Sequence, residues 1–213
     1  MPQLFLPSHP ENQVAMAAYM RDQFFFLGVM ATERRELTKP IIKLSRQVDL
    51  SELQAWIAGY MQQPAREYQY VAIDLALANV KRFTPELFDW CVTQITVKAW
   101  WDTVDAWRKV MTTYLVEQEC LTTCGNQFIT TDEMWLRRVG ITLQLSLKDA
   151  TDPVFLTKAI EKSQPDLEFF IQKAIGWALR DYSKTAPVWV KAFVASHQLS
   201  ALAQREALKA LQK

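Results

Sequence analysis

The residues best suited to chemistry lie in a short aromatic and acidic segment, ITVKAWWDTVDAW, which ends at Trp107. Trp101 and Asp105 are four residues apart, so on an α-helix they project from the same face. An indole beside a carboxylate could contact a cationic base while the carboxylate faces the attached sugar. The carboxylate would stabilise positive charge on the sugar carbon during hydrolysis and position a water molecule. Periodicity alone favours a plainer alternative, in which Trp101 packs and Asp105 is an ordinary solvated charge.

A second segment, DLEFFIQKAIGWALRDYSKT, alternates aromatic and basic side chains on one helical face. Phe170, Lys173, Trp177 and Arg180 follow one another at steps of three, four and three. The cations could neutralise phosphates while the indole packs against a nucleotide. The spacing is equally consistent with Phe170 and Trp177 in the core and the two cations at its rim.

The cysteines and histidines offer little chemistry. Cys91, Cys120 and Cys124 are an odd number, and the pair spaced four apart has no second pair or nearby histidine to complete a zinc site. We therefore expect reduced core cysteines and no metal. His9 and His197 are too far apart in sequence to suggest a dyad.

Composition indicates a compact helical globule. The chain has 213 residues, a formal net charge of +1, half its residues hydrophobic and only 5 glycines, which excludes disorder, collagen and turn-rich all-β folds. We expect a single domain over residues 1–213, with residues 1–10 irregular. The longest apolar run, 24–31, is short of the roughly 18 residues that span a bilayer. The chain start also lacks a basic leader followed by a long apolar stretch, so we expect a cytoplasmic protein with no membrane partner.

Apolar residues recur at helical spacing along the chain, and several helix starts have a physical explanation. Thr84 and Asp152 each stand before a proline as caps, while Ser51 and Thr130 are predicted to open capping boxes. Pro40 should kink or restart its helix. Two pairs of helix starts repeat at 34 residues, which is typical of an α-solenoid with a concave wall. The predicted helices are 11–23, 33–46, 52–62, 65–80, 85–95, 98–119, 131–147, 153–163, 167–184, 187–196 and 201–211.

The two chemical segments together resemble the AlkD-type DNA alkylation repair family, alkylpurine DNA glycosylases built from HEAT-like helical repeats. Three further stretches support the likeness: YMRDQFFFLGVMATERREL, MWLRRVGITLQLSLK and the tail LSALAQREALK. The likeness runs from about residue 11 to the carboxyl end. It implies an all-α solenoid of HEAT-like antiparallel helix pairs with a concave DNA-binding face.

The resemblance also implies roles for single residues. The family's catalytic aspartate matches Asp105, and its two lesion-facing tryptophans match Trp101 and Trp177. Arg138 and Arg180 match DNA-backbone arginines, although an ion pair between repeats is an alternative for Arg138. The remaining candidates are Tyr19, which would help enclose the lesion unless it is a core residue, and three possible phosphate contacts, Lys98, Lys173 and Lys184.

The implied activity is hydrolysis of the N-glycosidic bond of cationic N3- and N7-alkylated purines, such as 3-methyladenine and 7-methylguanine, in duplex DNA during base excision repair. The family needs no cofactor and engages the nucleotide from its backbone side without a closed base pocket; we expect a monomer. The alternative is a noncatalytic helical-repeat module that binds distorted DNA or a protein partner. Convergence of Trp101, Asp105 and Trp177 on one open cleft would favour the enzyme, whereas an internal ion pair of Asp105 would favour the binding module.

Overall fold

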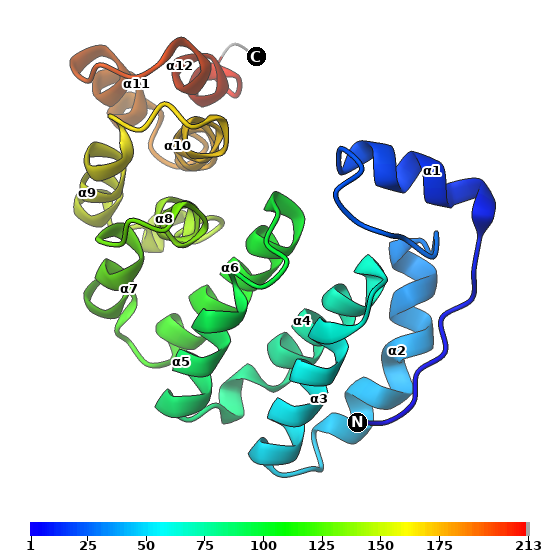
Figure 1. Ribbon diagram of the computed structural model, residues 1–213. Coiled ribbons are helices and arrows are strands. Elements are labelled where there is room, and N and C mark those ends of the chain that lie inside the picture. Colours follow the sequence, from blue (N-terminus) through cyan, green and yellow to red (C-terminus); the bar gives the residue numbers. More distant parts are fainter. Residues whose placement is uncertain (212–213) are drawn as a thin grey trace. The chain divides into compact units, whose positions relative to one another are not determined.

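Regular secondary structure is helical throughout residues 1–211, the part of the chain that the computed structural model describes (Figure 1). This part contains twelve α-helices and two short 3-10 helices, together with one isolated bridge between Phe25 and Ala65. The chain divides into two compact units, Met1–Val97 and Lys98–Lys213. The single-domain organisation stays a prediction. None of the helices within residues 1–211 combines the length and apolar character needed to cross a membrane.

The first unit is built on helix pairs. Helix α3 packs against α4, and α4 packs against α2. The side chains of Leu53 and Ile57 on α3 and of Val71 and Leu75 on α4 are fully buried in this core. The bounds are α1 (Pro10–Tyr19), α2 (Ala31–Ser45), α3 (Leu50–Gln62), α4 (Arg66–Asn79), η1 (Val80–Arg82) and α5 (Pro85–Gln94).

Helix α2 runs without interruption through Pro40, so the predicted restart is wrong. The helix buries Arg34 and Thr38 before the proline and Ile41 and Ser45 after it. Burial on both sides of Pro40 keeps α2 continuous, because packing supplies most helical stability and outweighs one lost backbone hydrogen bond; the kink at Pro40 stays a prediction.

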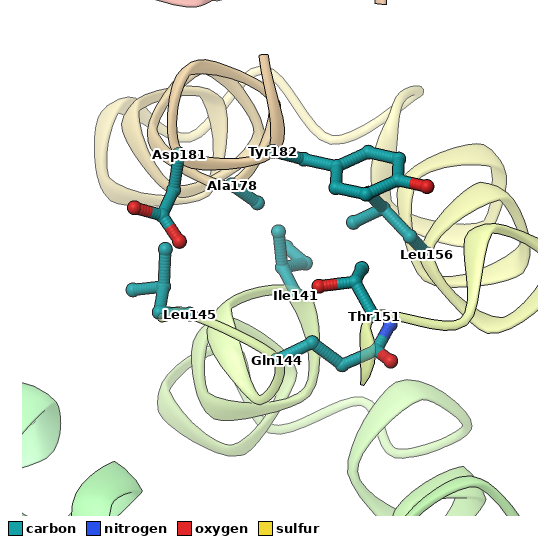
Figure 2. A pocket seen from close by; sticks show the side chains of 8 residues that line it. All are labelled: Ile141, Gln144, Leu145, Thr151, Leu156, Ala178, Asp181 and Tyr182. Atoms are coloured by element: carbon teal, nitrogen blue, oxygen red, sulfur yellow. The ribbon is translucent and has the colours of Figure 1, made fainter. Parts of the chain in front are cut away.

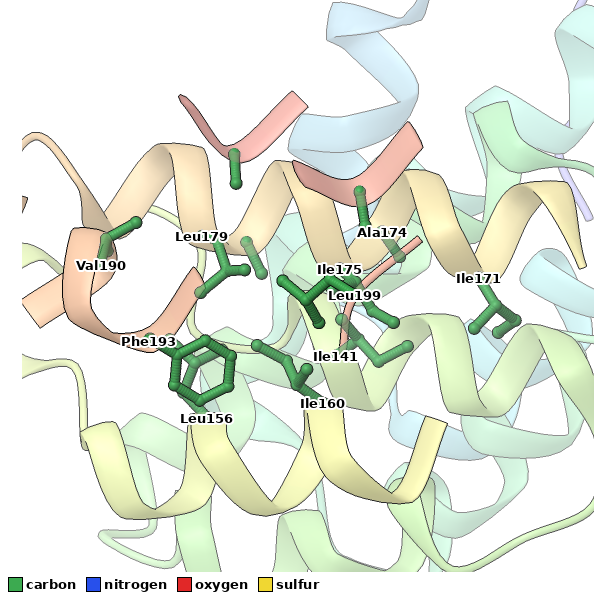
Figure 3. Packing of buried hydrophobic residues seen from close by; sticks show 13 residues of the cluster. Ile141, Leu156, Ile160, Ile171, Ala174, Ile175, Leu179, Val190, Phe193 and Leu199 are labelled. Carbon is green, nitrogen blue, oxygen red and sulfur yellow. The ribbon is translucent and has the colours of Figure 1, made fainter. Parts of the chain in front are cut away.

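The second unit centres on α8, which packs against α6, α7, α9 and α10, while α10 packs most extensively against α12. Its hydrophobic cluster joins side chains of five successive helices, including Ile141, Leu156, Ile175 and Val190 (Figure 3). The bounds are α6 (Trp101–Glu117), α7 (Leu121–Ile129), α8 (Met134–Thr142), η2 (Lys148–Ala150), α9 (Pro153–Ser163), α10 (Phe169–Tyr182), α11 (Pro187–Ser196) and α12 (Ala201–Leu208).

Most predicted helices are confirmed, with differences at the ends. Helix α7 was not expected, because its nine residues LTTCGNQFI include threonines and a glycine, which are weak helix formers. The predicted repeat of 34 holds between the starts of α9 and α11, whereas α10 and α12 start at 169 and 201.

The helix caps divide evenly between confirmed and wrong predictions. Thr84 and Asp152 cap α5 and α9 through their side-chain oxygens, as expected. The cap of α3 is Asp49 rather than Ser51, whose hydroxyl instead donates to Asp49. The cap of α8 is Glu133 rather than Thr130, because the chain before it still belongs to the end of α7.

Candidate active site

Trp101 and Asp105 lie on the first turns of α6, where the sequence predicts them. The helix begins at Trp101, and Trp100 before it has extended backbone angles. Val104 and Trp107 are fully buried and fix the helix in the core. Trp101 and Asp105 are half-buried on a neighbouring side of α6.

The carboxylate of Asp105 is held by a guanidinium from α8. Arg138 donates from Nε to Oδ1 at 2.9 Å and from Nη2 to Oδ2 at 2.8 Å, the paired geometry in which arginine binds carboxylates best. The side chains of Arg138 and Asp105 are only 6% and 17% exposed. A third bond, from Arg138 Nη1 to the carbonyl oxygen of Phe170 at 2.7 Å, ties α6 and α8 to the start of α10.

Burial and charge act in opposite directions on Asp105. Burial raises the pKa of this carboxyl above its ordinary value of 3.8, while the hydrogen bonds and charge of Arg138 and the charge of Arg108 oppose the rise. Arg108 is itself buried, and its Nε has no hydrogen-bond partner within residues 1–211. Burial lowers the pKa of Arg108, and the charges of Asp105 and Asp181 counteract it. The carboxylate of Asp105 thus lies in a cluster of alternating buried charges.

The side chain of Phe170, whose backbone carbonyl Arg138 binds, belongs to an aromatic cluster. The ring centroids of Trp100 and Phe170 are 5.0 Å apart, and the two rings meet edge-on. The ring centroid of Trp135 lies 5.1 Å from that of Phe170 and 5.9 Å from that of Trp100. These distances are those of favourable aromatic pairs. Trp135 was not singled out in the sequence, although it stands three residues before Arg138 and hence on the same side of α8.

The predicted cations of α10 converge on one buried acid. The carboxylate oxygens of Glu206 on α12 form ion pairs with three side-chain nitrogens: Lys173 Nζ at 3.0 Å, Arg180 Nη1 at 3.1 Å and Lys209 Nζ at 2.5 Å. The lysine hydrogen bonds and charges lower the pKa of Glu206 to about 2, with that of Lys209 acting most strongly. The side chain of Glu206 is 5% exposed, whereas those of Lys173 and Arg180 are 37% and 34% exposed. The group keeps a surplus of positive charge at the surface.

Gly176 allows this convergence. A Cβ at this position would lie 2.4 Å from the Cβ of Glu206 and 2.9 Å from the carbonyl oxygen of Ala203. Only glycine therefore lets α10 and α12 approach closely enough for Glu206 to reach Lys173 and Arg180. The pair Glu206 and Lys209, spaced three apart in the tail stretch, was the available signal for this cluster in the sequence.

The other predicted residues differ in exposure and in their partners. Trp177 is half-buried on α10, two turns beyond Phe170, and its convergence with Trp101 and Asp105 stays a prediction. Lys184 is exposed and pairs with Asp181 at 3.0 Å. Lys98 is half-buried, with a positive φ of 49° just before α6. Tyr19, the last residue of α1 in the first unit, is 70% exposed and so is not a core residue.

A small hollow between α8 and α10 cannot hold a base. Residues of α8 and the following turn form one wall, and Ala178, Asp181 and Tyr182 of α10 form the other (Figure 2). Its volume of about 10 Å³ is space for one water molecule at most. Within residues 1–211 no group of three or more histidine, cysteine, aspartate or glutamate side chains could hold a metal ion.

These observations define a class of protein: an all-helical protein in which paired helices present tryptophans beside a buried carboxylate and guanidinium. The sequence matches the model of the DNA alkylation repair enzyme family over residues 3–211. The chain belongs to this family. No curated protein matches the sequence.

Solved structures agree with this assignment. The chain is similar to a predicted DNA alkylation repair enzyme from Enterococcus faecalis, with 45% identity, a TM-score of 0.95 and coverage of 99% of this chain and 100% of the other. AlkD2 from Streptococcus mutans shares 15% identity, with a TM-score of 0.69 over 92% and 98% of the two chains. Smu.31 from Streptococcus mutans UA159 shares 16%, with a TM-score of 0.64 over 83% and 96%. The last two similarities establish the helical-repeat fold.

Proposed function

We propose that the protein is a monofunctional DNA glycosylase that removes cationic N3- and N7-alkylated purines, such as 3-methyladenine and 7-methylguanine, from duplex DNA. The observation that carries the proposal is that α6 places the half-buried carboxylate of Asp105 one turn from Trp101, in a chain that belongs to the DNA alkylation repair family. Membership of a DNA alkylation repair family supplies the substrate class.

The chemistry fits a carboxylate that keeps its charge. In an alkylated purine the leaving base is already cationic, so the bond between C1′ and the base nitrogen breaks with its electron pair and the base departs neutral. A water oxygen then bonds to C1′, and its proton passes to Asp105 or to solvent, which leaves an abasic site. The negative charge of Asp105 stabilises the oxocarbenium-like sugar carbon in the transition state.

The remaining residues receive supporting roles in this proposal. Trp101 and Trp177 contact the damaged nucleotide, and Tyr19 helps to enclose it. Arg180 and Lys173 contact phosphates from the exposed side of the Glu206 cluster, and Lys98 and Lys184 extend this contact. Arg138 holds Asp105 in place and would reach a phosphate only with the two guanidinium N–H groups that its three bonds leave over. The protein would act as a monomer, without a cofactor.

Asp105→Asn tests the proposal directly. The change keeps the shape of the side chain and removes its charge. With duplex DNA that contains 7-methylguanine, we expect release of the free base to fall by at least about 100-fold, the usual cost of losing one transition-state electrostatic contact. Asp102→Asn is the matched control, because it makes the same change one turn earlier on α6. Equal release by the wild type and Asp105→Asn would reject the catalytic role.

A second candidate function is noncatalytic recognition of damaged DNA. The internal ion pair between Asp105 and Arg138 favours it, because a carboxylate that is already neutralised has a weaker field at the sugar. This alternative predicts that the wild type binds the alkylated duplex more tightly than the undamaged duplex but releases no base. It also predicts that Asp105→Asn changes this preference only through protein stability.

A further inference from the structure

The first unit carries a hollow that the proposed chemistry does not use. It has a volume of about 480 Å³ and lies along α2, with one residue of α4 at its side. Its lining residues are Arg35, Thr38, Lys39, Ile42, Lys43, Arg46 and Asp74, which we call the α2 groove. Four of these seven residues are cations and one is an acid, in a chain whose net charge is only +1.

The cations of the α2 groove form a row. Arg35, Lys39, Lys43 and Arg46 follow one another at steps of four, four and three, so they share one face of the helix. At about 1.5 Å per residue the row is about 16 Å long, which spans about five base-pair steps at 3.4 Å each along the DNA axis. The last two cations also stand at the carboxyl end of α2, where the helix dipole favours positive charge.

These charges are available to a ligand. All four cations of the row are exposed. Within residues 1–211, Arg35, Lys43 and Arg46 take part in no ion pair, and Lys39 pairs at 2.6 Å with Glu36, which is exposed as well. An exposed pair of this kind is weak and gives way readily to a phosphate.

The single acid of the α2 groove does not cancel the row. Asp74 on α4 is bound at 3.5 Å by Arg34, which faces the core side of α2 and is 7% exposed. The guanidinium of Arg34 in turn lies 4.7 Å from the ring of Tyr70. The negative charge of Asp74 is thus offset by a cation outside the row.

The floor of the α2 groove offers no reactive group. Thr38 is 2% exposed and its hydroxyl donates to the carbonyl oxygen of Arg35 in the same helix, while Ile42 is apolar. A hollow with a basic rim and an inert floor is suited to binding an anion rather than to transforming it. The length of the row selects an extended polyanion over a small one.

We propose that the α2 groove is a second DNA contact, which binds the phosphodiester backbone of duplex DNA without reading its sequence. The choice of DNA as the ligand rests on the proposed function. The geometry of the α2 groove does not depend on that function. The row would add affinity and salt dependence and would leave the hydrolysis at Asp105 unchanged.

The test compares two pairs of lysines. Lys39→Gln/Lys43→Gln neutralises the middle of the row, and Lys162→Gln/Lys191→Gln is the matched control, since these two lysines are also exposed but lie on α9 and α11. Binding of the full chain to an undamaged duplex is measured between about 50 and 200 mM salt. We expect the groove variant to lower the salt slope by about 1.8 and the affinity at 0.1 M salt by about 60-fold. The control should match the wild type.

Equal slopes for the groove variant and the control would overturn the inference. Inorganic phosphate at 10 mM is the second arm: at constant ionic strength it should weaken duplex binding by the wild type more than by the groove variant, and equal weakening of both would count against the inference. Base release at saturating enzyme is measured in parallel. The two proposals can fail separately. If the α2 groove does not bind DNA, base release should still depend on Asp105. If the protein is not a glycosylase, the salt slopes can still be interpreted, because the binding assay uses undamaged DNA.

Discussion

The ion pair between Asp105 and Arg138 predicts a large energetic coupling between α6 and α8. Arg138→Met removes the guanidinium but keeps most of the side-chain volume. It leaves behind a carboxylate that is 17% exposed and has lost two hydrogen bonds, and it frees the carbonyl of Phe170. Removing one partner of a buried pair costs about 3–5 kcal/mol, and we expect the lower end, about 3 kcal/mol, because the charge of Arg108 also acts on Asp105.

The coupling is measured with a double-mutant cycle. Urea unfolding is followed by tryptophan fluorescence for the wild type, Arg138→Met, Asp105→Asn and the double variant. The double variant should be more stable than the sum of the single changes predicts, by about 2 kcal/mol. Arg137→Met is the control: this neighbour on α8 pairs with Asp166, but both side chains are more exposed, so the loss should stay below about 1 kcal/mol.

The loss in Arg138→Met should also depend on pH. Burial already raises the pKa of Asp105, and without Arg138 it should rise further. A carboxyl whose pKa is higher in the folded than in the unfolded protein binds protons preferentially when folded, so its penalty grows as pH rises through the folded pKa. The destabilisation should therefore be larger at pH 8 than at pH 5. A coupling below about 0.5 kcal/mol, or a loss that is equal at both pH values, would refute the idea that Arg138 compensates a buried charge.

Further predictions concern the second cluster and the chemistry. Glu206→Gln should cost about 1–2 kcal/mol at pH 7, after solvent screening of its partly exposed partners. Because the pKa of Glu206 is lowered from 4.5 to about 2, its contribution to the free energy of unfolding is complete above about pH 4.5 and disappears as pH falls towards 2. The urea midpoints of the wild type and Glu206→Gln should therefore differ more at pH 7 than at pH 3. Gly176→Ala should lower stability by about 1–3 kcal/mol, since the new Cβ meets the Ala203 backbone; an unchanged melting temperature would contradict this packing. Arg180→Gln should reduce the salt slope of DNA binding by about 0.9, and a wild-type slope would remove it from the contact surface. EDTA should leave base release unchanged; inhibition that zinc or magnesium reverses would contradict a mechanism without metal.

The sequence predicts the helices well, because their signals are local. Thr84 and Asp152 cap their helices in the expected way, since the cap and its proline are neighbours in sequence. Helix α7 has no such signal and forms because Phe128 and Ile129 are buried against neighbouring helices. Pro40 is the reverse case: a strong local signal is overridden by tertiary packing on both sides of it.

The candidate site is predicted in part. Helical spacing places Trp101 and Asp105 on one face, and this is local information. The partners of the charged residues are not local: Arg138 lies 33 residues from Asp105, and Glu206 lies 26 residues from Arg180. Periodicity predicts which face of its own helix a residue occupies. It does not predict which other helix that face contacts. The sequence therefore identifies the charged residues without the pairs that determine their pKa values.

Under the proposed function, the paired state of Asp105 restricts which bases the protein would release. An acid catalyst must hold a proton, and the two hydrogen bonds from Arg138 favour the charged carboxylate and oppose the rise in the pKa of Asp105 that burial causes. Neutral lesions such as uracil or hypoxanthine need a proton or an equivalent hydrogen bond to leave, whereas N3- and N7-alkylated purines do not. We therefore expect measurable release of 7-methylguanine and none of hypoxanthine from otherwise identical duplexes, over a blank without enzyme. Release of both bases at similar rates would mean that Asp105 acts as an acid, and that the ion pair opens when DNA binds.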